Sequence, residues 1–486
     1  MPESQLIYDR YHLTMGNFAL TERANIREKQ LADLNAVFYL AQRKKIFAPC
    51  VGHERLLESL TAKNLGRPRL RFLEADKANL ALIAQRLASI SYPFRIRCVR
   101  PGTIIFAGEP FADIEGPFVE TQMAEILFEH AFDEPITTAG NALAMRLEAG
   151  DRWLSDFSLR RNGNLERACE IAKYAYIGGF DDTSNMEAAY RMDINPVGTM
   201  AHFLVQAFSQ WSFKEEGKHF EQLVFERWLD AHPRGTTLLV DTISTRTGVI
   251  HAIKAALGSP SRKQALKLLR IDSAKDLKSL IEDCHWTRRM LDANGLTETG
   301  IIITGDMDAE KIRELVAAAP FVYGFGVGTK LAAETVVAGV IFKLCEIDYF
   351  PTMKLSAEEK KKTIAGKVQI FRCENKEGIY VMDIITTADE PNPSTERKQY
   401  KNLPEFSKSS PLLSNFWGAE DSSPKMPTIE EQRTFVKEQV QKFGGKQGLY
   451  NYPIVFSPNL RDRINSIGKK FQEDPNLKEG IITIEG

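Results

Sequence analysis

The stretch from about residue 230 to residue 350 constrains the fold more than any other part of this 486-residue chain. Short apolar runs with the composition of buried strands recur there about every 20–35 residues, with helical patterns between them. The runs cover residues 237–240, 267–271, 300–304 and 321–323, and another begins near 336. Strands that alternate with helices form βα units, which build a parallel sheet, either open or closed into a barrel. The sequence therefore predicts an α/β domain here.

Polar residues or glycines follow each of the first four predicted strands. They are Asp241-Thr242, Asp272-Ser273, Gly305-Asp306 and the run 324–329. Ligands bind at the carboxyl ends of parallel strands, where loops and helix N-termini gather. We therefore expect these residues to line one site.

Two glycine-containing loops are candidates for phosphate binding. One alternates Gly324, Gly326 and Gly328 ahead of Thr329, and the other places Gly305-Asp306 before a predicted helix. Backbone N–H groups in such loops can approach an anion closely, and a helix N-terminus adds partial positive charge. A tight turn at a barrel strand would also produce the first run, so that pattern alone leaves both interpretations open.

Three further side chains each allow a functional and a structural interpretation. Asp272 could accept hydrogen bonds from two ribose hydroxyls, or it could cap the next helix. Arg270 lies on the same strand face as Asp272, since it is two residues earlier, and it could balance phosphate charge or lie on the surface. His202 begins an apolar helical pattern, where a lone histidine is more often structural than catalytic.

Composition excludes several classes of partner. The chain has 63 Lys and Arg against 64 Asp and Glu, a formal net charge of -1, so no long-range field would recruit nucleic acid or anionic lipid. Residues 1–13 lack the apolar core of a secretory signal, and about 18 uninterrupted apolar residues occur nowhere. The six cysteines are far apart and form no C-x-x-C pair for zinc or redox chemistry. We expect a cytoplasmic protein with reduced core thiols.

The flanking segments are of mixed type. An amphipathic helix is predicted over about residues 22–44, a β-rich run over 94–99 and a long helix over 115–132. Residues 385–427 have the composition of an irregular surface crossing. Thr428 and Glu431 form a predicted capping box for a helix that ends near residue 443, and Ser457 is a predicted N-cap before Pro458.

A series of short motifs follows one order along nearly the whole chain. They are YDRYHLTM (8–15), EGP (115–117), DFSLRR (156–161), YIGGFD (176–181), TSN (183–185), GTMAH (198–202), VDT (240–242), RIDS (270–273), GFGVGT (324–329), YPI (452–454) and SP (457–458). No single motif is decisive, but the set in this order resembles nicotinate phosphoribosyltransferases.

The resemblance implies the fold of a type II phosphoribosyltransferase. In that fold an irregular, TIM-like α/β barrel joins an α+β domain built from N-terminal and later segments. We accordingly predict an α+β domain over residues 1–135 and a barrel over 136–350. Residues 351–486 are expected to return to the N-terminal domain as β-rich chain, followed by the surface crossing and C-terminal helices. The resemblance also implies a homodimer with shared active sites.

Several residues gain a role in substrate binding from the resemblance alone. Phe157 would stack on the pyridine ring in one subunit and Tyr11 of the other subunit would cover it, although ordinary core packing is the alternative for both. Arg160 and Arg161 would neutralise the nicotinate carboxylate or the pyrophosphate. Ser184 stands where the nicotinamide-using branch has an aspartate, which favours a carboxylated base.

The implied reaction forms nicotinate mononucleotide and pyrophosphate from nicotinate and 5-phosphoribosyl 1-pyrophosphate, the first step of NAD salvage from nicotinate. Mg²⁺ would accompany pyrophosphate and ATP, and no metal-ligating residue is predicted. ATP, the co-substrate, would phosphorylate His202, whose tautomer Asp241 would fix. Asp272 would hold the ribose diol and the glycine loops the 5′-phosphate. Thr199, in the motif of His202, is a further expected substrate contact.

Four positions depart from the family pattern, which keeps two alternatives open. They are Ser158, Asp182, Ile243-Ser244 and Ala274-Lys275. A lost glycine costs about 1–2 kcal/mol where the backbone needs positive φ, and Asp182 adds negative charge beside an anionic base. The alternatives are a divergent phosphoribosyltransferase with another base or weak ATP coupling, and a non-catalytic binding or regulatory protein on the same scaffold.

Overall fold

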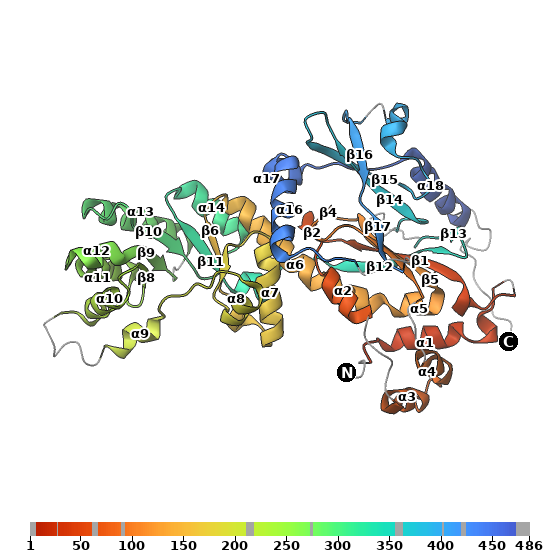
Figure 1. Cartoon of the computed structure of the whole chain (residues 1–486), viewed down its shortest axis with the longest axis horizontal. Helices are drawn as coiled ribbons and strands as arrows, with labels where there is room; N and C mark the ends of the chain where they lie inside the picture. Colours follow the sequence, from red (N-terminus) through yellow and green to blue (C-terminus); the bar gives the residue numbers. More distant parts are fainter. Residues whose placement is uncertain are drawn as a thin grey trace, which may run out of the picture. The chain divides into compact units, whose positions relative to one another are not determined.

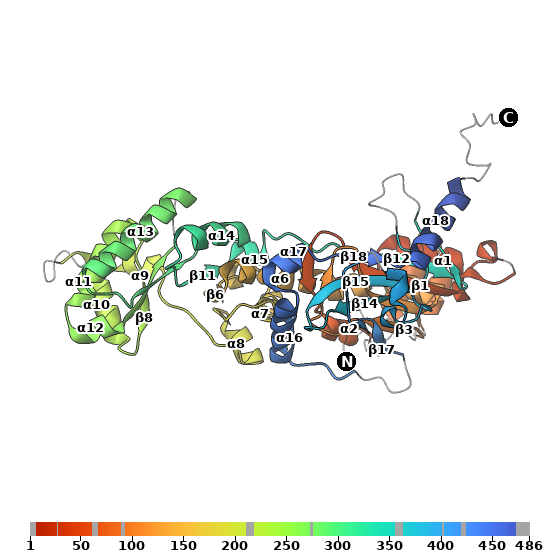
Figure 2. The same ribbon diagram turned by 90° about the horizontal axis from the view of Figure 1, so that it is seen from above.

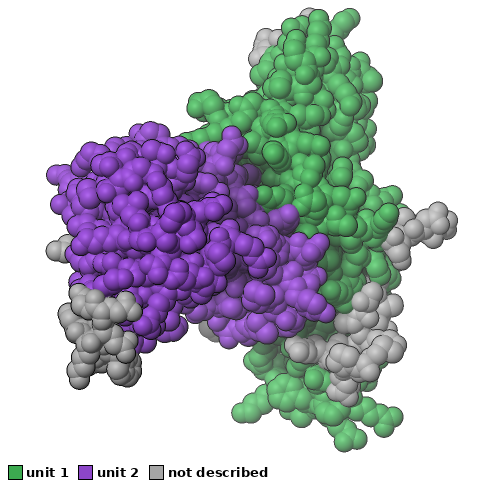
Figure 3. Space-filling model, turned by 60° about the vertical axis from the view of Figure 1, so that its left-hand side comes forward, with its two compact units in different colours: residues 1–137, 337–486 green, residues 138–336 purple. Residues whose placement is uncertain are grey.

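The computed structural model describes residues 6–26, 28–60, 67–88, 93–209, 218–272, 276–354, 363–400, 403–418 and 424–472. Two compact units make up the chain, as the two colours of Figure 3 show. Unit 1 contains residues 1–137 and 337–486, and unit 2 contains residues 138–336. The chain thus leaves unit 1 once and returns to it once.

Unit 2 is built on six strands in the order β7-β6-β11-β10-β9-β8, and every neighbouring pair is parallel. The strands are β6 (Trp153–Asp156), β7 (Asp182–Thr183), β8 (Thr236–Leu239), β9 (Leu266–Ile271), β10 (Gly300–Ile303) and β11 (Gly324–Val327). Leu238, Leu269 and Ile301 are fully buried between the sheet and its helices. The α/β fold class with a parallel sheet is confirmed.

Helices connect these strands, and α10–α13 gather beside β8–β10 in both ribbon views (Figures 1 and 2). Seven helices of unit 2 begin at a side chain that caps the backbone: Asn164 for α7, Asn185 for α8, His219 for α10, Ser244 for α11, Ser259 for α12, Asp276 for α13 and Asp308 for α14. Such caps satisfy N–H groups that lack partners within the helix. The helices of unit 2 are α7 (Leu165–Ile177), α8 (Met186–Met192), α9 (His202–Ala207), α10 (Phe220–Ala231), α11 (Thr245–Leu257), α12 (Pro260–Ala265), α13 (Leu277–Ala293), α14 (Ala309–Ala318) and α15 (Thr329–Ala332), with η3 (Leu159–Arg161).

Unit 1 contains an antiparallel six-stranded sheet in the order β13-β12-β1-β5-β3-β17, a four-stranded sheet in the order β16-β14-β15-β18 and the pair β2-β4 (Figure 1). Within the four-stranded sheet, only the pairing of β15 with β18 is parallel. The strands are β1 (Asn35–Gln42), β2 (Phe47–Pro49), β3 (Arg95–Cys98), β4 (Ile104–Phe106), β5 (Pro110–Pro117), β12 (Val340–Ile347), β13 (Phe350–Pro351), β14 (Val368–Glu374), β15 (Tyr380–Thr387), β16 (Lys408–Pro411), β17 (Ser414–Trp417) and β18 (Ile454–Phe456).

The helices of unit 1 confirm two sequence signals. Thr428 and Glu431 form the predicted capping box of α16, and the Ser457 hydroxyl accepts a hydrogen bond from the Leu460 N–H at the start of α18. The helices are α1 (Arg10–Ala19), α2 (His53–Leu60), α3 (Arg67–Glu74), α4 (Ala81–Ala88), α5 (Phe118–Met123), α16 (Ile429–Lys442), α17 (Gly445–Tyr450) and α18 (Pro458–Gln472), with short 3₁₀ turns η1 (Glu22–Ala24), η2 (Leu31–Asp33), η5 (Pro393–Thr395) and η6 (Arg397–Tyr400). Helix α6 (Glu125–Ala149) begins in unit 1 and ends in unit 2.

One helix prediction is wrong, and a second is confirmed except for its first three residues, in both cases for physical reasons. Residues 22–44 form two 3₁₀ turns and strand β1, which pairs with β5 and β12 and is buried along nearly its whole length. A strand buried on both faces loses its alternating pattern and cannot be told from a buried helix by periodicity. Residues 115–117 close strand β5, and helix begins only after Pro117 and continues in α6 to Ala149.

Two further features bear on the sequence predictions. Strand β12, placed by sequence at the end of the barrel segment, instead pairs with β1 in unit 1. Among the described residues, no helix has both the length and the apolar character needed to cross a membrane.

Candidate active site

A cleft of about 860 Å³ lies at the carboxyl ends of the parallel strands of unit 2. Clefts of this size hold small-molecule ligands. Most of the residues predicted for the site line it: Phe157, Arg160, Arg161, Asp241, Asp272, Gly305, Asp306, Gly326, Gly328 and Thr329. Because they come from four strand ends and the loop after β6, the topology of the parallel sheet is what brings them together.

His202 lies at the edge of this cleft beside two carboxylates. Its Nε2 atom is 3.7 Å from Asp272 Oδ2 and 4.0 Å from Asp241 Oδ1. Its Nδ1 atom is 3.1 Å from the hydroxyl oxygen of Thr242. The ring is one-third exposed. Its hydrogen bond is thus to a hydroxyl group, and the carboxylates face the other ring nitrogen.

The two aspartates are held by hydrogen bonds in fixed positions. The backbone N–H of Asp272 donates to Asp241 Oδ2 at 2.8 Å, and the Thr304 hydroxyl donates to Asp272 Oδ1. Helix α13 is capped by Asp276 instead, so the capping role considered for Asp272 is excluded. A quarter of the Asp272 side chain remains exposed toward the cleft.

Arg270 and Thr199 do not line the cleft, but Arg270 interacts electrostatically with Asp272 and Asp241, which do. The Arg270 Nη1 atom donates to the Thr199 hydroxyl at 3.3 Å, and its buried Nε has no partner within the described part of the chain. Burial lowers the pKa of Arg270, and the nearby Arg160 charge adds to this, whereas Asp272 and Asp241 oppose it. Two arginines therefore concentrate positive charge beside the carboxylates.

Close packing explains why glycines occupy positions 324 and 326, which the sequence alone did not show. Gly324 and Gly326 lie within strand β11, whereas the predicted strand 321–323 precedes it. A Cβ atom on Gly326 would lie 2.5 Å from the Phe157 ring, and one on Gly324 would lie 2.3 Å from the Trp153 carbonyl oxygen. These glycines let β6 and the Phe157 ring approach β11 closely.

Gly305 is a glycine for a different reason, since its φ of +102° is a conformation that side-chain-bearing residues rarely adopt. A Cβ atom there would also lie 2.7 Å from the Asp272 carbonyl oxygen. The loop from Gly305 to the Asp308 cap of α14 therefore lies directly against Asp272.

The departures from the family pattern are accommodated without backbone strain. Ser158 has φ -85°, and Asp182 is not among the residues with positive φ. Asp182 is buried and accepts a hydrogen bond from Trp153 Nε1 at 2.6 Å. Burial raises its pKa to about 6. Ser244 caps α11. Ala274-Lys275 lies outside the described residues.

Five predicted site residues do not line the cleft of unit 2: His202, Thr199 and Arg270, described above, and Ser184 and Tyr11. Ser184 follows β7, where its backbone N–H donates to the Asp156 carbonyl oxygen. Tyr11 belongs to α1 of unit 1, and its hydroxyl donates to Glu125 Oε2 at 3.0 Å. Its neighbour His12 is buried and is 2.8 Å from the same oxygen.

Sequence reasoning missed two contributors, Thr304 and Lys311, and gave no separate role to Thr242, which it expected at a strand end. Thr304 follows β10 next to Gly305, so the rule of strand ends could have found it. Lys311 lines the cleft, and its Nζ donates to the Asp306 carbonyl oxygen at 2.7 Å. No sequence signal marks Lys311, because it lies in the first turn of α14 and not at a strand end.

Comparison with known proteins identifies the family of the chain. Residues 153–362 match the model of the nicotinate phosphoribosyltransferase (NAPRTase) family, and residues 367–462 match the nicotinate phosphoribosyltransferase C-terminal domain. Nicotinate phosphoribosyltransferase pncB1 of Mycobacterium tuberculosis is 30% identical over 407 residues, which are 82% of this chain and 85% of the relative. This chain belongs to the nicotinate phosphoribosyltransferase family. It is thus a member of an enzyme family, and the resemblance seen in the sequence motifs is confirmed.

Other relatives agree with this assignment. Nicotinate phosphoribosyltransferase of Bacillus subtilis is 31% identical over 295 residues, which are 58% of this chain and 57% of the relative. The crystal structure of human nicotinic acid phosphoribosyltransferase matches with a TM-score of 0.70 at 21% identity and covers 95% of this chain and 100% of the human one. At that identity the human structure is evidence for the fold alone, and it agrees with the fold expected from the sequence motifs.

Proposed function

We propose that this chain transfers a phosphoribosyl group from 5-phosphoribosyl 1-pyrophosphate to nicotinate, giving nicotinate mononucleotide and pyrophosphate. One observation carries the proposal within the family: His202, Asp241 and Asp272 converge, with separations up to 4.0 Å from the imidazole, at a cleft that also presents Phe157 and Arg160. In the reaction the C1–O bond to pyrophosphate breaks and the pyridine nitrogen forms the new bond to C1. The protein mainly positions the reactants and stabilises charge.

The ribose and phosphate contacts follow from the strand ends. Asp272 would accept hydrogen bonds from the two ribose hydroxyls, since Thr304 orients one of its oxygens and the other faces the cleft. Arg270 has a buried Nε without a partner in the described residues, so a phosphate oxygen would satisfy it. The loop at Gly305 and the backbone around Gly328 would hold the 5′-phosphate.

The carboxylates of the cleft fit the cation that accompanies polyphosphates. Mg²⁺ prefers oxygen ligands, and Asp241 and Asp306 both present carboxylate oxygens to the cleft. Mg²⁺ would offset the charge of pyrophosphate or ATP there.

We further propose that ATP phosphorylates His202 at Nε2. An Nδ1–H donated to the Thr242 hydroxyl leaves the lone pair on Nε2, the nitrogen that faces the two carboxylates. The γ-phosphorus–oxygen bond of ATP breaks as Nε2 forms its bond to phosphorus, and ADP leaves. Hydrolysis of the phosphohistidine would then favour nucleotide synthesis.

Base selection is the direct test of the proposed activity. With Mg²⁺ and ATP present, we expect nicotinate to react at least about tenfold better than nicotinamide in kcat/KM, a difference of about 1.4 kcal/mol. The reason is that Arg160 would pair with the carboxylate of nicotinate, and nicotinamide has no such charge. Mononucleotide and phosphate release from a panel of pyridine bases measure it. Equal use of the two bases, or no transfer to any base, would contradict the assignment.

We also propose a homodimer in which Tyr11 completes the site of the other subunit. The support is that Tyr11 is half-exposed on α1 of unit 1, so its ring face is accessible, while the cleft lies in unit 2. A cytoplasmic location is proposed as well, because all six cysteines are free thiols in the structure.

Mixing two inactive variants tests the shared site. Tyr11→Ala and Arg160→Ala proteins should each be impaired, and their mixture should regain part of the activity, because one site in a hybrid dimer carries both native residues. Activity before and after mixing is measured alongside subunit exchange by native mass spectrometry. Exchange without recovered activity would refute the sharing of the site.

A further inference from the structure

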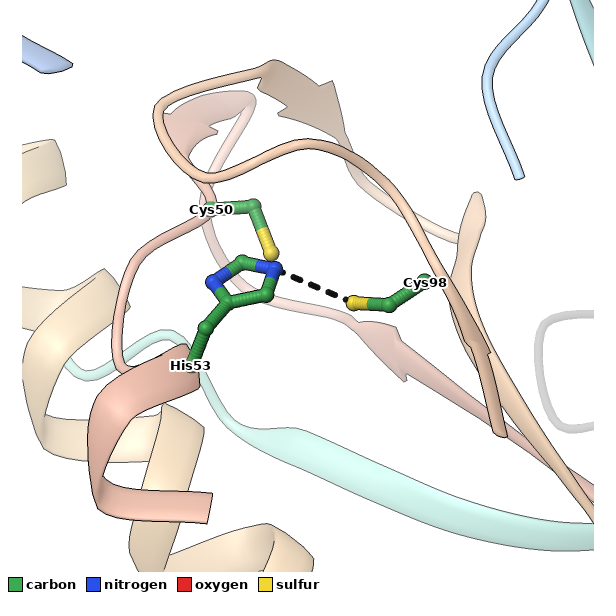
Figure 4. A group of neighbouring side chains, drawn as sticks. All are labelled: Cys50, His53 and Cys98. Carbon is green, nitrogen blue, oxygen red and sulfur yellow. Dashed lines mark hydrogen bonds between the residues drawn. The ribbon is translucent and has the colours of Figure 1, made fainter. Parts of the chain in front are cut away.

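Cys50, His53 and Cys98 form a buried group in unit 1 that the proposed reaction does not use (Figure 4). Cys50 and His53 flank the turn from β2 into α2, and Cys98 is the last residue of β3. Their exposed fractions are 0%, 0% and 2%. The two cysteines are 48 residues apart by number and belong to segments of two different sheets, so the fold and not the sequence spacing brings them together.

The backbone of the turn fixes this arrangement. Gly52, between the cysteine and the histidine, has φ +113°, and a Cβ atom there would lie 2.1 Å from the Ala131 carbonyl oxygen. Only glycine fits this position. The turn directs Cys50 and His53 toward the same point, where Figure 4 shows both sulfur atoms beside one edge of the imidazole.

The donor atoms are nearly at the spacing of a metal site. His53 Nε2 is 3.1 Å from Cys98 Sγ and 2.9 Å from the Val99 carbonyl oxygen, and the three side-chain donors all lie within 4.8 Å of one another. Tetrahedral Zn²⁺ with Zn–S of about 2.3 Å and Zn–N of about 2.0 Å would place sulfur about 3.5 Å from nitrogen. The separation of His53 Nε2 and Cys98 Sγ is therefore a few tenths of an ångström shorter than in such a site, and all three donors are close enough to converge on one ion.

We propose that Cys50, His53 and Cys98 bind a Zn²⁺ ion that links α2 to β3. Two thiolates and a neutral imidazole cancel the charge of Zn²⁺, which suits a fully buried site. The Val99 carbonyl oxygen, 2.9 Å from His53 Nε2, is a candidate for the fourth position. Carboxylate-free, sulfur-rich donor sets favour Zn²⁺ over Mg²⁺ or Ca²⁺.

Proton balance is straightforward at this site. Binding releases the thiol protons to solvent, and the imidazole proton moves from Nε2 to Nδ1, which has no hydrogen-bond partner within the described residues.

A second group of metal-binding type within the described chain provides a matched control. His219 is the N-cap of α10, Glu221 lies in α10 and His251 lies in α11. This group contains no sulfur. Its Glu221 and His251 already pair at 2.7 Å. Zinc bound there would lack thiolate ligands, so spectroscopy can distinguish the two groups.

The experiment measures metal content and ligand type in the full-length protein, produced with added zinc and freed of any affinity tag. We expect elemental analysis to find about one zinc ion per chain, and Cys50→Ser and Cys98→Ser to reduce this at least fivefold. Cys284→Ser, which changes a buried thiol in unit 2, and His251→Gln should retain it. Chelated wild type titrated with Co²⁺ should develop thiolate-to-metal charge-transfer bands with the d–d bands of a tetrahedral site.

The Co²⁺ titration decides the question even if the cysteine variants fail to fold, because it uses the wild-type chain. Folded wild type without zinc and without thiolate charge-transfer bands would overturn the proposal. Zinc that persists in folded Cys50→Ser but disappears in His251→Gln would overturn it as well, and so would a Cys50–Cys98 disulfide in place of the metal.

Discussion

Replacement of His202 by alanine is expected to abolish ATP hydrolysis and its coupling, a loss of at least about 100-fold, and to leave slow ATP-independent transfer. The phosphoryl acceptor would be gone, whereas Asp272, Arg270 and the loop at Gly305 would still hold the ribose phosphate. Wild type incubated with ATP and Mg²⁺ should yield an acid-labile, base-stable phosphoenzyme, which mass spectrometry would place at residue 202. His285→Ala is the matched control, because His285 is a half-buried histidine of unit 2 that contacts the Ala318 carbonyl oxygen and does not line the cleft.

Two further variants identify the group that orients the ring. Thr242→Val removes the hydroxyl beside Nδ1 at nearly constant volume, and Asp241→Asn removes a charge 4.0 Å from Nε2. Both should slow phosphorylation without removing the acceptor, and Thr242→Val should do so by about tenfold, the value of one hydrogen bond of about 1.4 kcal/mol. Normal ATP hydrolysis by His202→Ala, or nucleotide formation by a wild type that never becomes labelled, would show that the phosphohistidine mechanism is wrong even though the family is right.

Asp272→Asn is expected to lower kcat/KM for phosphoribosyl transfer by about 100–1000-fold, or about 2.7–4.1 kcal/mol. The carboxylate would make two charge-assisted hydrogen bonds to the ribose diol, each worth about 1.5–3 kcal/mol, and an amide cannot accept both. The variant should fold normally, since its amide oxygen can still accept the Thr304 hydroxyl and its backbone N–H still reaches Asp241.

The measurement compares transfer with and without ATP, because loss of ribose binding affects both whereas loss of His202 affects only the coupled reaction. Asp308→Asn is the control: Asp308 also follows a strand end, but it caps α14 and does not line the cleft. Asparagine caps helices about as well as aspartate, so that variant should retain activity. Full activity in Asp272→Asn would remove Asp272 from the ribose contact.

Much of unit 2 was predictable because its signals are local. The strands β8, β9 and β10 are short apolar runs that each end in a polar residue, and helix caps such as Asp308 are read from a few adjacent residues. The pattern of buried residues and the helix caps each depend on residues within one element, so both can be recognised in the sequence alone. The same holds for the Thr428 capping box and for the Ser457 cap in unit 1.

Strand β1 shows where local signals fail. Its eight residues read as helix, yet pairing with β5 and with β12, about 300 residues later in the chain, makes them a central strand. The stability that strand pairing adds depends on the partner strands, which are distant in the chain and so are absent from the local pattern. For the same reason the predicted helix starts too early: residues 115–117 pair within β5, and the helix begins only at Phe118.

The order of the motifs and the local burial patterns were enough to predict the family, the parallel sheet of unit 2 and the strand ends that carry Asp241, Asp272 and Gly305. The contacts of the site residues came only from the folded chain: Thr242 lies beside His202, Thr304 donates to Asp272, and the Phe157 ring packs against Gly326. The fold also brought Cys98 to Cys50 and His53. Hydrogen bonds and metal donors act over about 2–4 Å in space, and only the folded chain sets which distant residues come within that range.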